Sequence, residues 1–126
     1  MTQSINAGTP GHPIAIEPAA GRVVVTLGER TIADSANALM LREANYPPVY
    51  YIPRGDVDMA LMQRTDHSTH CQFKGDASYY SIAEGGERSV NAAWSYEAPF
   101  EDVAAISGHL AFYPNRVDAI VETPLA

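Results

Sequence analysis

The chain has 126 residues with 15 acidic and 8 basic side chains, a formal net charge of -7. This length predicts a single domain, and the acidic balance argues against nucleic acid as a partner, because surfaces that bind phosphates are basic. The single cysteine excludes an intrachain disulfide, which fits a reducing compartment. The sequence has no apolar run near the ~20 residues of a membrane helix and no signal-peptide pattern at its start. We therefore expect a soluble, cytoplasmic protein that does not bind membranes.

The first third of the chain predicts an arm followed by short strands. Residues 1–12 are rich in small and polar side chains and predict a flexible arm, so that the β domain spans residues 13–126. The β-branched run at residues 22–27 predicts a strand, and residues 30–33 follow a Gly-Glu turn as its hairpin partner. Residues 36–43 favour helix by composition. Because they lie between short strands, we interpret them as a strand.

The middle of the chain predicts one strand, one helix and one loop. Residues 49–52 form a strand that Pro53 ends. Asp56 is a suitable N-cap for a helix of about two turns over residues 57–63. The polar residues 63–70 are expected to form a loop.

The second half predicts further strands separated by turns. Strands are expected over residues 71–73, 76–83, 89–94, 109–113 and 117–121. Residues 84–87 have the glycines of a hairpin turn, and residues 100–107 hold a helical turn that Gly108 ends. The sum is a mainly β, antiparallel domain with one or two short helices, built as a barrel, a sandwich or a folded sheet.

The stretch from residue 70 to 81 contains the only cysteine and the only lysine of the chain. Cys71 has three interpretations: a nucleophilic thiolate, a thiol that contacts a ligand, or a small buried apolar residue. Lys74, beside a glycine, suits an anion such as phosphate or carboxylate, or is a solvated lysine on an edge strand. In a regular strand these two residues point to opposite faces, so they meet only across a turn or bulge.

Other side chains complete a candidate binding pocket. Arg54 is suited to clamp an anion with two hydrogen bonds. Several aromatic residues would either wall a pocket for a planar ligand or form ordinary core: Tyr50, Tyr79, Tyr80, Trp94 and Tyr96. Lys74-Gly75 is not a phosphate-binding P-loop, because the upstream glycine is missing and no parallel βα unit surrounds it.

Two further groups of side chains carry atoms suited to metal binding or acid–base chemistry. Asp66, His67, His70 and Cys71 carry groups that zinc accepts, but structural zinc sites use paired elements and only one cluster is present, so no metal is predicted. Asp34 with Glu43 would be a carboxylate pair only if the fold brought the two together.

The order of motifs resembles a known family. C-x-x-K-G-x-A-x-Y stands at residues 71–79 and A-W-x-Y at residues 93–96, after P-V-Y-Y-I-P at residues 48–53. This order over roughly residues 21–118 resembles the family called domain of unknown function 427, sometimes labelled a nucleotidyltransferase. The matching residues are Asp34, Glu43, Tyr50, Asp56, Cys71, Lys74, Trp94 and Tyr96. The resemblance implies a β-tent fold similar to the Mss4-like group and no established activity, and it supplies no catalytic residues. Mss4-like zinc proteins use two cysteine pairs, which this chain lacks, and His67 and His70 lie outside the motif.

These observations lead to one leading hypothesis and two alternatives. The leading hypothesis is a pocket for a small, anionic, partly planar ligand, without a cofactor, lined by Tyr50, Arg54, Cys71, Lys74, Tyr79, Trp94 and Tyr96. The first alternative is an enzyme that uses Cys71 as nucleophile, or Lys74 with Asp34 or Glu43 in phosphoryl or nucleotidyl transfer. The second is a structural or protein-interaction module whose edge strands pair with a partner. A monomer and a homodimer are both compatible with the sequence.

Overall fold

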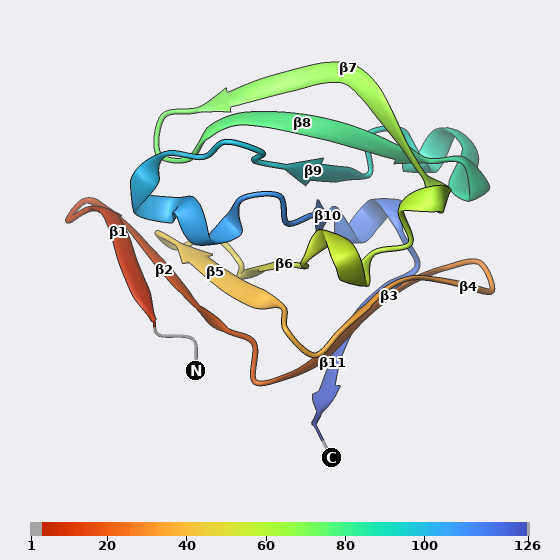
Figure 1. The fold of residues 1–126 in the computed structure, drawn as a ribbon, viewed down its shortest axis with the longest axis horizontal. Helices are drawn as coiled ribbons and strands as arrows, with labels where there is room; N and C mark the ends of the chain where they lie inside the picture. The colour runs from red at the N-terminus through yellow and green to blue at the C-terminus, as the bar shows by residue number, and fades with distance from the viewer. Residues whose placement is uncertain (1–3, 126) are drawn as a thin grey trace.

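The computed structural model describes residues 4–125, which form three antiparallel sheets (Figure 1). The strand orders are β1-β2-β5-β6 in the first sheet, β10-β9-β8-β7 in the second and β11-β3-β4 in the third. The strands are β1 (Ile5–Thr9), β2 (His12–Pro18), β3 (Gly21–Leu27), β4 (Arg30–Ser35), β5 (Leu39–Glu43), β6 (Val49–Tyr51), β7 (Met62–Cys71), β8 (Gly75–Ile82), β9 (Ala93–Ser95), β10 (Ala111–Phe112) and β11 (Ala119–Pro124). Short 3-10 helices lie between them: η1 (Arg54–Asp56), η2 (Met59–Leu61), η3 (Ala83–Ser89), η4 (Glu101–Ile106) and η5 (Pro114–Arg116).

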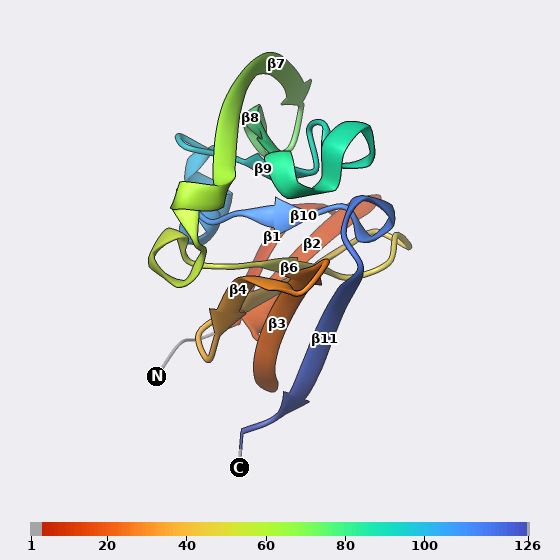
Figure 2. The ribbon, with the colours of Figure 1, turned by 90° about the vertical axis from the view of Figure 1, so that its right-hand side faces the viewer.

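The three sheets lean against one another around the centre of the molecule. Strands β7, β8 and β9 lie above and β3, β4 and β11 lie below, with β6 and β10 between them (Figure 2). A bridge between Ile52 and Leu110 connects the first sheet to the second. The expected mainly β, β-tent fold with only short helices is confirmed.

Alternating burial along the strands creates two hydrophobic clusters. In β3 every second side chain is buried, and Val23 and Val25 enter a cluster with Ile82 of β8. Ile16 of β2 and Leu41 of β5 belong to a second cluster, which also includes Ala77 and Tyr79 of β8. This alternation is what a half-buried antiparallel sheet requires. The two clusters meet near β6 and β9, where the candidate site lies.

The structure corrects the expectations for the start of the chain and for the helix. The expected arm is wrong from Ile5 onward, because β1 pairs with β2 in a hairpin; residues 1–3 lie outside the described residues. Residues 39–43 form β5, which confirms the strand interpretation. Of the helix expected over 57–63, only the 3-10 helix η2 over Met59–Leu61 forms, and β7 begins at Met62. Asp56 caps no helix there; its carboxylate accepts a 2.7 Å hydrogen bond from Ser35 Oγ.

The loop expected over residues 63–70 is also wrong. These residues belong to β7, an edge strand that pairs with β8 and has an irregularity between Arg64 and Ser68. Their side chains are mostly exposed, so their polarity reflects the solvated face of an edge strand rather than a loop. Residues 84–87, expected as a hairpin turn, belong to the 3-10 helix η3. The return strand expected over residues 89–94 is the shorter β9. Residues 71–73 are mainly turn.

Within residues 4–125, no helix is both long enough and apolar enough to cross a membrane.

Candidate functional site

The turn between β7 and β8 directs Lys74 into the molecule. The Lys74 amide donates to the Cys71 carbonyl at 3.3 Å, and the Lys74 carbonyl accepts from the Phe100 amide at 3.0 Å. Gly75 has a φ of +110°, a region that favours glycine because a Cβ is strained there. The glycine therefore serves backbone conformation rather than close approach of a ligand. Lys74 is 6% exposed, so it is not a solvated edge-strand lysine.

Glu43 of β5 holds the Lys74 ammonium through a short ion pair. The same carboxylate lies 2.7 Å from His12 Nε2, and the His12 ring stacks on Phe73 with centroids 4.1 Å apart. An ammonium has three N–H donors. Among residues 4–125, Glu43 is the only hydrogen-bond partner of that ammonium, and the Tyr96 ring lies 5.8 Å from it. Two donors of Lys74 thus remain for another acceptor.

Glu43 is an ionised carboxylate at neutral pH. Burial by itself raises its pKa, but the hydrogen bonds from Lys74 and His12 and the two nearby charges outweigh burial and lower the pKa below its ordinary value. The charge of Lys74 is therefore compensated inside the protein.

This lowered pKa predicts acid sensitivity of the fold. A carboxyl group with a depressed folded-state pKa stabilises the fold above its unfolded pKa of about 4.5, and this stabilisation is lost as the pH falls through the folded value. One such group contributes a slope of at most about 1.4 kcal/mol per pH unit. Urea unfolding between pH 7 and pH 3 should show a shallower acid slope in Glu43→Gln than in the unaltered protein. Equal slopes would contradict the assignment. Glu87→Gln, at an exposed glutamate with no ion pair among residues 4–125, is the matched comparison.

The ion pair lies at the wall of a small cavity of about 180 Å³. Its other walls are mainly aromatic and come from β6, β8, β9 and the adjoining loops. The aromatic lining residues are Tyr46, Tyr51, Tyr79, Trp94, Tyr96 and Tyr113. We call this cavity the Lys74 pocket.

Three tyrosines that line the Lys74 pocket, Tyr51, Tyr96 and Tyr113, are uncharged at neutral pH. Burial raises the pKa of Tyr51 and of Tyr96 far above the ordinary phenol value. It raises the pKa of Tyr113 to about 12, with a hydrogen bond to Tyr79 acting in the same direction. Trp94 Nε1 donates to the Tyr51 hydroxyl at 3.2 Å. Lys74 and Glu43 are therefore the only charged residues among those that line the pocket.

Four of the seven expected ligand-binding residues line the Lys74 pocket: Lys74, Tyr79, Trp94 and Tyr96. Tyr50 lines an adjoining apolar cavity instead, with its hydroxyl donating to Glu122 at 2.5 Å. Cys71 is half-buried and packs against the second hydrophobic cluster, outside the lining of the pocket. Cys71 ends β7 and Lys74 precedes β8, so the two lie across a turn rather than along one regular strand, and the Lys74 amide donates to the Cys71 carbonyl.

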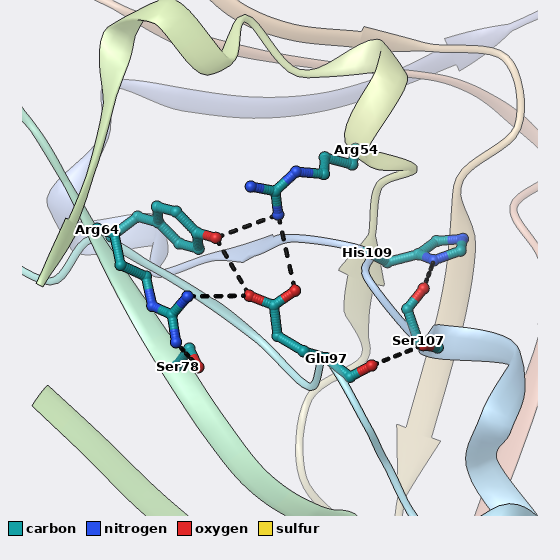
Figure 3. A network of polar contacts seen from close by, with 7 residues as sticks. Arg54, Arg64, Ser78, Glu97, Ser107 and His109 are labelled. Atoms are coloured by element: carbon teal, nitrogen blue, oxygen red, sulfur yellow. Dashed lines mark hydrogen bonds and ion pairs between the residues drawn. The ribbon is translucent and has the colours of Figure 1, made fainter. Parts of the chain in front are cut away.

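Arg54 lies in a different polar network, which includes Arg64, Ser78 and Glu97 (Figure 3). Its guanidinium donates to the Tyr80 hydroxyl at 3.1 Å and lies 3.8 Å from Glu97. Arg64 also contacts Glu97, at 3.4 Å, and donates to Ser78 at 2.7 Å. Arg54 is therefore occupied by protein groups and does not complete the cationic end of the Lys74 pocket.

The side chains considered for metal or carboxylate chemistry have separate partners. His70 Nδ1 lies 2.7 Å from Asp76, and the His67 ring packs against Tyr79. In the described part of the chain no three His, Cys, Asp or Glu side chains are grouped as a metal site would require. Asp34 pairs with Arg22, whereas Glu43 pairs with Lys74, so the two carboxylates do not act together.

The sequence identifies the support of Lys74 only in part. It names Glu43 as one of two carboxylates that could act with Lys74 in the enzyme alternative, and it predicts that His12 lies in the flexible arm. Each lies 31 residues from its partner in this cluster, and no local pattern connects them. Tyr51 and Tyr113 were likewise not singled out; the adjacent tyrosines 50 and 51 face opposite sides of β6, which strand alternation does predict.

Fold and site together define a small, mainly β domain with an aromatic pocket that ends at a buried lysine–glutamate pair. The model of a family described as a domain of unknown function (DUF427) matches residues 15–123. The chain belongs to this family. A comparison with curated proteins found no match.

Proposed function

We propose that the protein binds a small, partly planar ligand that presents one negatively charged edge to Lys74. The observation that carries this proposal is the position of the only lysine, buried at the wall of a pocket whose other sides are mostly aromatic rings. Aromatic walls with a few convergent polar groups are typical of small-molecule sites.

The dimensions of the pocket favour a single ring. A cavity of about 150 Å³ admits benzene, and the Lys74 pocket has about 180 Å³. The two remaining N–H donors of Lys74 suit a carboxylate edge, which would form charge-assisted hydrogen bonds. Because Glu43 already compensates the lysine and Arg54 lies elsewhere, one anionic group is the most that the pocket accommodates.

Benzoate is a suitable probe, with benzamide and benzylammonium as neutral and cationic comparisons. Trp94, the only tryptophan, lines the pocket, so its fluorescence reports binding directly. Benzoate should bind and benzylammonium should not. Hydrogen bonds to a charged group contribute about 1.5–3 kcal/mol. The double variant Lys74→Met/Glu43→Gln should therefore weaken the binding of benzoate by about tenfold or more, and it should weaken the binding of benzamide less.

Arg54→Gln is the matched control, because it removes a cation outside the pocket, and it should leave benzoate affinity unchanged. Preferential binding of benzylammonium, or benzoate affinity that depends on Arg54 and not on Lys74, would refute the proposal.

The geometry favours binding over catalysis. Lys74 does meet one carboxylate, Glu43, but Asp34 is paired with Arg22. Cys71 lies outside the lining of the pocket, and its neighbour His70 is bonded to Asp76. A nucleophile with an adjacent general base is the usual signature of covalent catalysis. No such pair involves Cys71 among the described residues.

A further inference from the structure

A second cavity, of about 410 Å³, adjoins the Lys74 pocket. The two share five lining residues: Tyr46, Pro47, Val49, Trp94 and Tyr113. We propose that the ligand is amphipathic, with its charged ring in the Lys74 pocket and an apolar tail in this second cavity, which we call the tail pocket. This inference rests on the proposed function, because it assigns the rest of the same ligand.

The walls of the tail pocket are almost entirely apolar. Val25, Ile52, Phe112 and Ile120 supply aliphatic or aromatic surface from four different strands or their ends. No charged side chain occurs among its described lining residues. A polar group placed there would lose its hydrogen bonds to water without replacement.

Two of the polar groups on its walls, those of Tyr50 and Trp94, are already engaged. The Tyr50 hydroxyl donates to Glu122 at 2.5 Å, and this hydrogen bond, followed by burial, raises the pKa of Tyr50. Trp94 Nε1 donates to Tyr51 on the side of the Lys74 pocket. Both residues therefore present their rings, rather than a free donor, to the tail pocket.

The shared wall places the charged and apolar regions within reach of one molecule. Lys74 and Glu43 occur only in the first lining, and Val25, Ile52 and Ile120 only in the second. The tail pocket falls within the roughly 300–1,000 Å³ of small-molecule sites. The occupant is thus a single small molecule, an aryl carboxylate or a similar anion with a hydrocarbon substituent.

The test uses the series benzoate, 4-ethylbenzoate and 4-butylbenzoate, titrated by calorimetry and by Trp94 fluorescence. Each buried methylene should tighten binding roughly fourfold, from about 0.8 kcal/mol per CH₂. The quantity compared between variants is the affinity ratio of 4-butylbenzoate to benzoate. That ratio isolates the contribution of the alkyl tail to affinity from the contribution of the charged ring.

Two substitutions probe the tail pocket. Ile120→Asn places a polar group in its wall, and Ile120→Phe fills part of its volume. Ile120 is half-buried on β11 and lines this pocket, whereas the next residue, Val121, is 47% exposed and faces the other side of the strand. Both Ile120 variants should reduce the affinity ratio by about tenfold or more. Val121→Asn, the matched substitution on the same strand, should preserve it.

Each outcome decides between the proposals. If benzoate binds but the alkyl substituents add nothing, the tail pocket inference is overturned and the proposed function stands. If no member of the series binds, the proposed function fails and the inference fails with it. If 4-butylbenzamide binds as tightly as 4-butylbenzoate and the Lys74→Met/Glu43→Gln variant has no effect, the tail pocket binds alone and the two-part ligand is refuted. An affinity ratio unaffected by either Ile120 variant also overturns the inference.

Discussion

Replacing Lys74 by Met should lower the free energy of unfolding by about 3 kcal/mol, the lower end of the cost of breaking a buried ion pair. The substitution preserves much of the volume and removes the ammonium. Glu43, which is largely buried, would then keep only the hydrogen bond to His12. Urea unfolding at pH 7 measures the loss.

The double variant Lys74→Met/Glu43→Gln provides the control for this prediction. Exchanging both members of a buried ion pair for uncharged groups is frequently close to neutral, because no uncompensated charge remains. The double variant should therefore be more stable than Lys74→Met alone. If the two are equally unstable, the loss comes from packing around the lysine side chain and not from the charge of Glu43.

Trp94→Ala should remove about 3 kcal/mol of stability and abolish binding of both benzoate and 4-butylbenzoate. Truncation of a core tryptophan costs about 3–5 kcal/mol, and the lower end applies because Trp94 is only half-buried. Its ring packs 4.5 Å from that of Tyr113 and edge-on to Tyr51, and it lines both cavities. Calorimetry is required here, because the variant lacks the fluorescent reporter.

Two milder variants separate the ring of Trp94 from its N–H group. Trp94→Phe retains an aromatic wall and removes the donor to Tyr51, while Tyr51→Phe removes the acceptor and keeps Trp94. Each should cost about 1 kcal/mol of stability and retain measurable binding. Affinity in Trp94→Ala equal to that of the unaltered protein would show that the shared wall does not contact the ligand.

Local patterns predicted most of the strands but missed the edge strands β1 and β7. The runs at residues 22–27 and 49–52 have β-branched or aromatic residues and clear turn signals at their ends, which is why they were found. Residues 63–70 carry almost no apolar side chains because β7 has solvent on much of its surface. Their pairing with β8 depends on backbone hydrogen bonds, which leave no signature in side-chain polarity.

The sequence predicts the part of the candidate site that lies within one sheet, but not the part that comes from another sheet. Lys74, Tyr79, Trp94 and Tyr96 lie on or beside neighbouring strands of one sheet, so adjacency in the predicted order brought them together. The charge of Arg54 suggests an anion site, but the orientation of its side chain depends on Glu97 and Tyr80. Glu43 and His12 reach Lys74 from another sheet, and contacts between sheets are not encoded in local periodicity.

The ion pair between Lys74 and Glu43 affects how an anionic ligand associates with the protein. Lys74 and Glu43 form a dipole, whose field declines with distance faster than that of a lone charge. At longer range an approaching anion meets the net charge of -7 and is repelled. Added salt screens that repulsion and so accelerates association, the reverse of what occurs when a protein steers its ligand electrostatically. Selection for an anionic edge therefore takes place by contact inside the pocket and not during diffusional encounter.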